Sequence, residues 1–282
     1  MPPHDRQLKT IAAHLKKKIK SELLALLKND REKYEAFFEN FKRPLKFGMY
    51  DNYGAEKEFL SDLVLFYSSS EKKSVTLKEY VERMQEDQKA IYYACGDSVE
   101  QIDHLPRTEM VKEKGYEILY FTEDVDEFAI KILGKYMDKE FSSVAAADLD
   151  LEDETAKAAD AIAEETNKEL LKAMKELLGD KVEKVKISSK LGSHPVCMSC
   201  EGEISLEMEK ALNAMPGGGG MKAKRVLEVN QNHHVFDRLK TLQTEKDKLK
   251  KLTNVLYTCA LLIEGLQIED ATAFVDDACD LM

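Results

Sequence analysis

The stretch "KLKKLTNVLYTCALLIEGLQ", from Lys248 to Gln267, decides how the last part of this chain folds. Its apolar residues recur in steps of three and four, which is the spacing of one face of an α-helix. The same spacing returns after "IED" and continues to the C-terminus, so the pattern predicts a hairpin of two helices. The apolar positions are Leu249, Leu252, Leu256, Cys259, Ile263 and Leu266 in the first helix and Ala271, Phe274, Ala278 and Leu281 in the second.

The apolar faces of this hairpin are wider than the two helices can cover for each other, because Val255, Leu262, Val275 and Cys279 extend them. The uncovered part must meet either the preceding sheet or a second copy of the chain. Two hairpins related by a two-fold axis would form a four-helix interface. We predict such a homodimer; the alternative is a hairpin that covers only its own domain. The predicted interface residues are Leu249, Leu252, Leu256, Cys259, Ile263, Phe274, Ala278 and Leu281.

Length and composition narrow the class of protein. At 282 residues the chain exceeds what one hydrophobic core usually organises, so two or three domains are expected. The net charge of −11 disfavours a nucleic-acid partner. No apolar run approaches the roughly 20 residues that a membrane span needs, and the first thirty residues lack the apolar core of a signal peptide. We therefore expect a cytoplasmic protein with neither nucleic acid nor membrane as partner.

The N-terminal part, residues 5–43, is predicted to be helical. In "LKTIAAHLKKKIKSELLALL" apolar residues keep a helical spacing from Leu8 to Leu26. The following segment "DREKYEAFFENFKRPL" has an aromatic face that we predict to be core, and Pro44 is predicted to end the helix. The aromatic residues are Tyr34, Phe37, Phe38 and Phe41.

From Ser74 onward the pattern changes to short strands that alternate with helices. Thr76, followed three residues later by Glu79, matches a capping box, which begins a helix. "AIYYAC" and "YEILYF" are predicted strands, and the stretch between them is predicted to be helical. This order predicts a small parallel sheet with helices on its faces.

Taken together, these patterns predict a helix-rich α+β protein. We predict a helical domain at 1–72, a small three-layer α/β module at 73–147 and an α+β dimerisation domain at 148–282, which ends in the helical hairpin. The second boundary rests on "AAADLDLEDETAKAAD", whose small and acidic residues are typical of a solvated linker.

Sequence patterns for nucleotide or metal chemistry are weak in this chain. After the first strand comes "CGDS", with one glycine, and neither G-x-G-x-x-G nor G-x-x-x-x-G-K-[ST] occurs. The "CMSC" pair, Cys197 and Cys200, would supply only two of the four ligands of a structural zinc site. The segment "HPVCMSC" is predicted to be a strand, and on a strand residues three apart point to opposite faces. We therefore predict buried thiols, no metal site and no catalytic residue.

A methionine-bearing helix is predicted at "EISLEMEKALNAM", from Glu203 to Met215, followed by Pro216 and four glycines. Its apolar residues lie on one helical face. Such a stripe is either buried core or an exposed binding surface. Methionine repacks against many partner shapes, so an exposed stripe would suit a binder of varied partners. The stripe consists of Ile204, Met208, Ala211, Leu212 and Met215.

Several segments, in order, resemble a known family. "EKYEAFFENFKRPLKFG", "SVTLKEYVERMQEDQKAIYYACGDS", "KEKGYEILYFTEDVDEFAI" and "EVNQNHHVF" resemble the ninety-kilodalton heat-shock chaperones, most closely their bacterial branch, high-temperature protein G. The resemblance implies the later part of the family's middle domain plus its C-terminal dimerisation domain. It also implies that the ATPase domain and the loop with the catalytic arginine are missing here. ATP and magnesium then belong to the full-length family, and we expect no cofactor and no ATP hydrolysis in this chain.

The same resemblance implies contact residues for clients, the unfolded proteins that a chaperone binds. Ile204, Met208 and Leu212 match exposed apolar positions, and Phe128 matches a large aromatic beside Glu127. The alternative for Phe128 is a place in the core of the small α/β unit. We expect a homodimeric, client-binding fragment of an ATP-dependent chaperone that assists protein folding under stress. The alternatives are an α/β small-molecule enzyme that uses "ACGDS" and Asp97, or a pure dimerisation scaffold. The predicted client-binding residues are Ile204, Met208, Ala211, Leu212, Met215, Phe128 and Glu127.

Overall fold

The computed structural model describes residues 3–147, 149, 154–189, 191–215 and 220–282. The chain forms two compact units, and each unit is built from two separate stretches of the chain. The first unit comprises Met1–Ile91 and Val125–Phe141, and the second comprises Tyr92–Asp124 and Ser142–Met282. The three predicted domains have other boundaries, and they stay a prediction. None of the helices in the described part of the chain is both long and apolar enough to cross a membrane.

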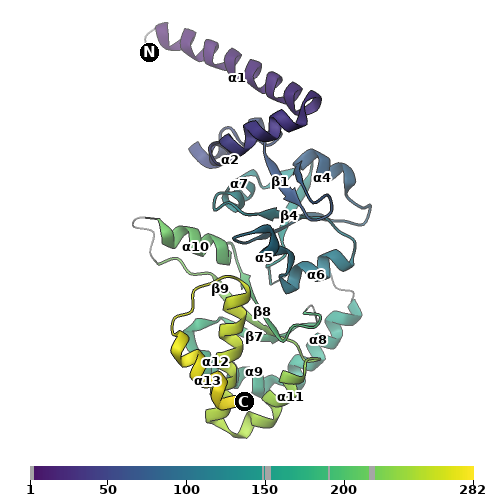
Figure 1. The fold of residues 1–282 in the computed structure, drawn as a ribbon, viewed down its shortest axis with the longest axis vertical. Coiled ribbons are helices and arrows are strands. Elements are labelled where there is room, and N and C mark those ends of the chain that lie inside the picture. The colour runs from purple at the N-terminus through teal and green to yellow at the C-terminus, as the bar shows by residue number, and fades with distance from the viewer. Residues whose placement is uncertain (1–2, 148, 150–153, 190, 216–219) are drawn as a thin grey trace. The chain divides into compact units, whose positions relative to one another are not determined.

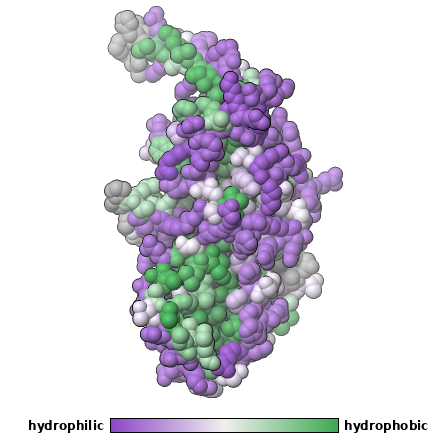
Figure 2. Space-filling model, viewed as in Figure 1, coloured by the Kyte–Doolittle hydropathy of each residue, from purple (hydrophilic) through white to green (hydrophobic). Residues whose placement is uncertain are grey.

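The first unit begins with helices, as predicted for residues 5–43. They are α1 (Pro3–Asn29), α2 (Arg31–Gly54) and the short α3 (Lys57–Leu60) (Figure 1). Asp30 separates α1 from α2, and its side chain caps α2 by accepting a hydrogen bond from the Lys33 N–H at 3.2 Å. The apolar stripe of α1, from Leu8 to Ile19, is exposed, and Figure 2 shows it as a band of hydrophobic surface along this helix.

The prediction that Pro44 ends its helix is wrong. α2 contains Pro44 and continues to Gly54, although Asp51–Tyr53 have non-helical backbone angles. A proline inside a helix removes one backbone hydrogen bond. The helix persists because the turns after it are held by packing, with Lys46 and Met49 both buried.

The aromatic face of α2 lies only partly in the core. Tyr34 and Phe38 are buried, which confirms the prediction for these two residues, whereas Phe41 is 49% exposed. The Tyr34 hydroxyl donates a hydrogen bond to the Leu63 carbonyl and so joins α2 to the segment before the first strand.

The rest of the first unit consists of two hairpins and two helices. Strands β1 (Leu65–Ser68) and β2 (Ser74–Thr76) pair antiparallel, and so do β5 (Lys135–Tyr136) and β6 (Lys139–Ser143), whose last two residues belong to the second unit. The helices are α4 (Leu77–Arg83) and α7 (Asp126–Leu133). The predicted capping box of α4 is confirmed: the Glu79 N–H donates to the Thr76 hydroxyl at 3.1 Å, and the Thr76 N–H donates to the Glu79 carboxylate at 2.7 Å.

The second unit contains the predicted strand–helix–strand segment. Strand β3 (Ala90–Cys95) pairs in parallel with β4 (Ile118–Phe121), with Tyr92 opposite Ile118. Helices α5 (Val99–Asp103) and α6 (Pro106–Glu113) connect the two strands. Parallel strands need such a crossover, because a tight turn cannot join them.

The remainder of the second unit is built on a three-stranded sheet. Its order is β7-β9-β8, with β9 (Lys224–Val229) parallel to β7 (Lys184–Ile187) and antiparallel to β8 (Val196–Glu201). The helices are α8 (Glu154–Thr166), α9 (Lys168–Leu178), α10 (Leu206–Ala214), α11 (His234–Thr241), α12 (Lys246–Ile263) and α13 (Ala271–Leu281). Helix α12 contacts β8, α9 and α13, as the lower part of Figure 1 shows. These elements confirm the helix-rich α+β class.

Candidate functional site

Helix α10 begins later than the sequence predicts. Ser205 is its N-cap and accepts a hydrogen bond from the Met208 N–H at 3.1 Å, so the first helical residue is Leu206. Ile204, predicted to lie on the exposed stripe, precedes the helix and packs partly buried against the hydrophobic core of the second unit. The glycine segment that follows the helix falls mostly at positions 216–219, which lie outside the described residues.

The inward face of α10 is held mainly by polar contacts. Its two buried residues are Leu206 and Glu209. One carboxylate oxygen of Glu209 accepts a hydrogen bond from the guanidinium of Arg225 at 2.8 Å, and the other accepts one from the Ala223 N–H at 2.8 Å. Arg225 in turn donates to the Tyr257 hydroxyl of α12 at 3.0 Å. A carboxylate with two donors, together with one leucine, therefore anchors this helix.

This anchoring leaves the methionine stripe on the other side of α10. At 3.6 residues per turn, Met208 lies about 200° around the helix from Leu206. Met208, Ala211 and Leu212 are half-buried, and Met215 is 52% exposed. The apolar stripe therefore stays partly open to solvent while a charged residue faces the protein. Apolar spacing alone does not predict this orientation, because a surface helix ordinarily turns its stripe toward the core.

A second polar contact lies on a flank of α10. The Lys210 ammonium donates to Asp97 at 2.9 Å and lies 3.3 Å from Glu207. Burial works against the charge of Lys210, but the hydrogen bond to Asp97 and the charge of Glu207 raise its pKa. Asp97, the acid of the enzyme alternative, thus serves as the partner of a lysine that stays charged.

Phe128, in the first unit, belongs to an exposed aromatic cluster on α7 and α2. Its half-buried ring meets Tyr50 edge-on, with centroids 5.7 Å apart, and Tyr50 lies 6.5 Å from Phe47. Phe47 and Tyr50 are 52% and 45% exposed. Sequence reasoning missed these two residues, because it ended α2 at Pro44. Their spacing of three on a continuing helix would have identified them.

A buried ion pair sets the start of α7, just before Phe128. The Lys46 ammonium lies 2.6 Å from the Asp126 carboxylate, with both side chains nearly inaccessible, and 4.6 Å from the centre of the Phe66 ring. Glu127, predicted to contact clients, is also buried and lies 3.5 Å from the Lys131 ammonium. The structure therefore gives Glu127 a role inside the unit and leaves Phe128 half-buried at the edge of the exposed aromatic cluster.

The terminal hairpin has an inner and an outer face. Leu249, Leu252 and Leu256 are buried in the core of their own unit. They are not available to a second chain, so for these three residues the alternative of a helix that covers its own domain applies. The outer face is formed by exposed Leu262 and Val275, and Figure 2 shows hydrophobic surface gathered over α12 and α13. The other predicted interface residues are half-buried: Cys259, Ile263, Phe274, Ala278 and Leu281.

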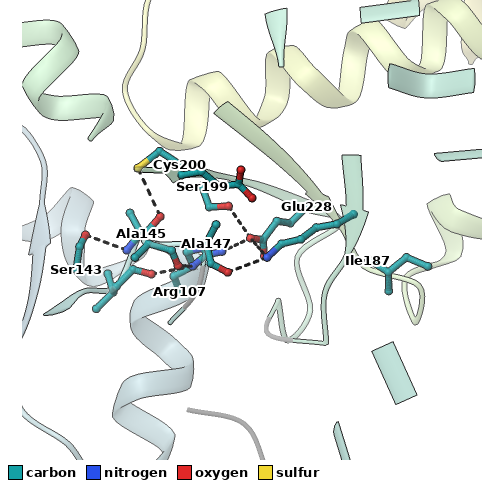
Figure 3. A network of polar contacts seen from close by, with 12 residues as sticks. Arg107, Ser143, Ala145, Ala147, Ile187, Ser199, Cys200 and Glu228 are labelled. Carbon is teal, nitrogen blue, oxygen red and sulfur yellow. Dashed lines mark hydrogen bonds and ion pairs between the residues drawn. The ribbon is translucent and has the colours of Figure 1, made fainter. Parts of the chain in front are cut away.

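A buried charge network joins α6 to the sheet (Figure 3). The Arg107 guanidinium donates to the Glu228 carboxylate and to the carbonyls of Val144 and Ala146, at 2.9 and 2.8 Å. Glu228 also accepts from the Ser199 hydroxyl at 2.6 Å and lies 3.1 Å from the Lys186 ammonium.

The network keeps Glu228 ionised. Burial alone would raise the pKa of Glu228, but the charges of Arg107 and Lys186 hold the pKa at about 2. No sequence pattern identified the pair, because its members lie 121 residues apart. The network holds residues 145–147, the first part of the segment predicted to be a solvated linker, against the strands of the sheet.

The two cysteines of "CMSC" lie on β8, which confirms the predicted strand, and both are buried. Burial raises the pKa of the Cys197 thiol, which favours an unreactive protonated form. Within the described ranges, no three His, Cys, Asp or Glu side chains are grouped so that they could hold a metal ion.

Comparisons with known proteins agree with the resemblance found in the sequence. The sequence model of the family described as Hsp90 protein matches residues 3–282. Chaperone protein HtpG of Clostridium perfringens is 57% identical over 283 residues, which cover 100% of this chain and 45% of that protein. The HtpG proteins of Bacillus subtilis and Clostridium acetobutylicum are 55% and 56% identical, over 100% and 99% of this chain and 45% of each relative. The chain spans a little under half the length of these curated relatives.

Proposed function

This chain belongs to the Hsp90 protein family, and from that premise we propose that it is the client-binding and dimerising part of a chaperone. It holds non-native polypeptides on the outward stripe of α10 and on the aromatic cluster around Phe128. It pairs with a second copy of itself through the outer face of α12 and α13. The matched relatives carry the name chaperone protein HtpG.

The orientation of α10 is the observation that carries this proposal. The helix buries Glu209 and leaves Met208 and Leu212 partly in solvent. Apolar surface left open in this way marks an interaction site. A flexible, polarizable methionine suits partners of varied shape, as a chaperone for many clients requires.

The dimer rests on the outer face of the hairpin. Leu262 and Val275 are exposed beside half-buried Ile263 and Phe274. A small cavity of about 100 Å³ lies beside Phe274 and is lined also by Tyr257, Leu261 and Ile268. An isologous pairing of two hairpins would cover these apolar side chains.

No cofactor is assigned to this chain, and ATP and magnesium belong in this proposal to the full-length family. What supports this is that the chain contains no phosphate-binding sequence pattern. The relatives also extend well beyond the matched region. The enzyme alternative has weaker support, since Asp97 is paired with Lys210.

The client site is tested by Met208→Glu, with Asn213→Glu as the matched control on an exposed polar position of the same helix. The dissociation constant for a fluorescently labelled unfolded polypeptide should rise about tenfold, which is about 1.4 kcal/mol, because a charge cannot replace a buried thioether. Asn213→Glu adds the same charge and should change the dissociation constant less than twofold. Equal effects of the two variants would refute the proposal.

The same two variants separate the chaperone from a pure dimerisation scaffold. Suppression of client aggregation should be weakened by Met208→Glu alone, while sedimentation shows an unchanged mass for both variants. If the chain proves dimeric but neither variant alters aggregation, the scaffold reading is correct.

A further inference from the structure

Glu209 is the one charged residue that α10 buries, and both of its carboxylate oxygens are occupied. Its partners come from two places in the chain: Ala223, where the chain returns after the glycine segment, and Arg225 in β9. Arg225 is itself tied to α12 through Tyr257. Glu209 therefore fixes the position of α10 relative to β9 and α12.

The apolar residues of α10 would by themselves favour a different orientation. Hydrophobic burial is non-directional and grows with the apolar area removed from water. Met208, Ala211 and Leu212 together offer more apolar surface than Leu206, so the greater burial would come from turning the stripe inward. Charge-assisted hydrogen bonds are directional and stronger than neutral ones. Two of them to Glu209 hold the helix against that rotation.

We propose that Glu209 and Arg225 are positioning residues that keep the client-contacting stripe of α10 turned toward solvent. The inference rests on the proposed function, because it explains how that surface is kept open. Tyr257 accepts a hydrogen bond from one nitrogen of Arg225 and so holds the guanidinium in place. The orientation of α10 therefore depends on α12 as well. When the carboxylate is removed, α10 rotates and Met208 packs against the unit.

The test measures where Met208 lies. In Glu209→Ala, the rate of Met208 oxidation by peroxide, followed by mass spectrometry, should fall about threefold, with exposed Met137 of the first unit as the internal reference. The dissociation constant for the labelled unfolded polypeptide should rise about tenfold. The reason is that a charge-assisted hydrogen bond no longer favours the outward orientation of α10, so the polypeptide must first turn the helix back. Glu207→Ala, which removes a carboxylate from a less buried side of the same helix, should change neither quantity.

A purely structural role for Glu209 would give another result. If α10 only unfolds in Glu209→Ala, Met208 oxidation rises and the amide protons of the helix lose protection, which overturns the proposal. An unchanged oxidation rate, or a slower rate with unchanged client affinity, overturns it too. Glu209→Gln keeps one oxygen that can accept a hydrogen bond but loses the charge, so both quantities should lie between those of Glu209→Ala and the wild type; a variant as impaired as Glu209→Ala counts against the pair. If Met208→Glu has no effect on binding, the proposed function fails; if only the Glu209 variant has none, this inference alone fails.

Discussion

Helices α10 and α12 of the second unit carry the same kind of apolar spacing and face opposite ways. α12 turns Leu252 and Leu256 into the core, whereas α10 buries Glu209 and leaves Met208 and Leu212 only half-buried. The difference follows from what each helix packs against. α12, with 18 residues, lies against β8 and α9, while α10, with nine, is held by Arg225 and the Ala223 N–H. An apolar period predicts that a stripe exists, and the partners of the opposite face decide where it points.

The largest expected effect comes from placing a carboxylate on the inner face of α12. Leu256→Asp should destabilise the second unit by at least about 5 kcal/mol, because it removes buried apolar surface and buries an unpaired charge. Denaturant unfolding followed by circular dichroism measures this. Met208→Glu, on the outward stripe of α10, should cost less than about 1 kcal/mol in the same experiment. Similar losses in the two helices would mean that they do not differ in orientation.

A somewhat smaller effect is expected for the charge network of Arg107. Glu228→Gln should lower the free energy of unfolding by about 3 kcal/mol at pH 7, because it leaves Arg107 and Lys186 without their buried counter-charge. Replacement of the more accessible Glu207 by Gln should cost less than about 1 kcal/mol. The two variants thus compare the stability lost when a fully buried carboxylate, Glu228, is neutralised with that lost at the more accessible Glu207.

The same variant makes a prediction about pH. Glu228 has a pKa of about 2 in the folded chain and an ordinary value of 4.5. A lowered carboxyl pKa stabilises the fold at pH values above 4.5, and this contribution is lost as the pH falls toward 2. The difference in stability between the wild type and Glu228→Gln should therefore shrink through that window. A difference that stays constant from pH 7 to 3 would show that the charge of Glu228 is not what stabilises the fold.

The smallest effect on stability is expected on the outer face of the hairpin. Val275→Asp should change the unfolding free energy of the single chain by no more than about 0.5 kcal/mol, because Val275 is 54% exposed. It should nevertheless convert the dimer to a monomer in sedimentation, since a charge would be buried at the centre of the interface. Thr272→Asp, also on the exposed part of α13, serves as the control and should remain dimeric. A dimer that survives Val275→Asp places the subunit interface elsewhere.

Local patterns anticipated much of the fold. The capping box of Thr76 and Glu79, the parallel strands β3 and β4, and the hairpin of α12 and α13 were all predicted, because each depends on residues close together in the chain. The family was recognised from segments spread over almost the whole chain. The resemblance predicts Ile204, Met208 and Leu212 as client contacts, and of these three only Ile204 lies outside α10.

By itself, then, the sequence determined most of the helices and the parallel strands β3 and β4, which residues form each apolar stripe, and to which family the chain belongs. The tertiary structure alone decided that α2 continues past Pro44, that Leu249, Leu252 and Leu256 face inward, and that α10 buries Glu209. It also decided the pairing of Arg107 with Glu228. The physical reason is common to all of these: each depends on contacts between residues distant in the chain, whose charge and packing outweigh local propensity.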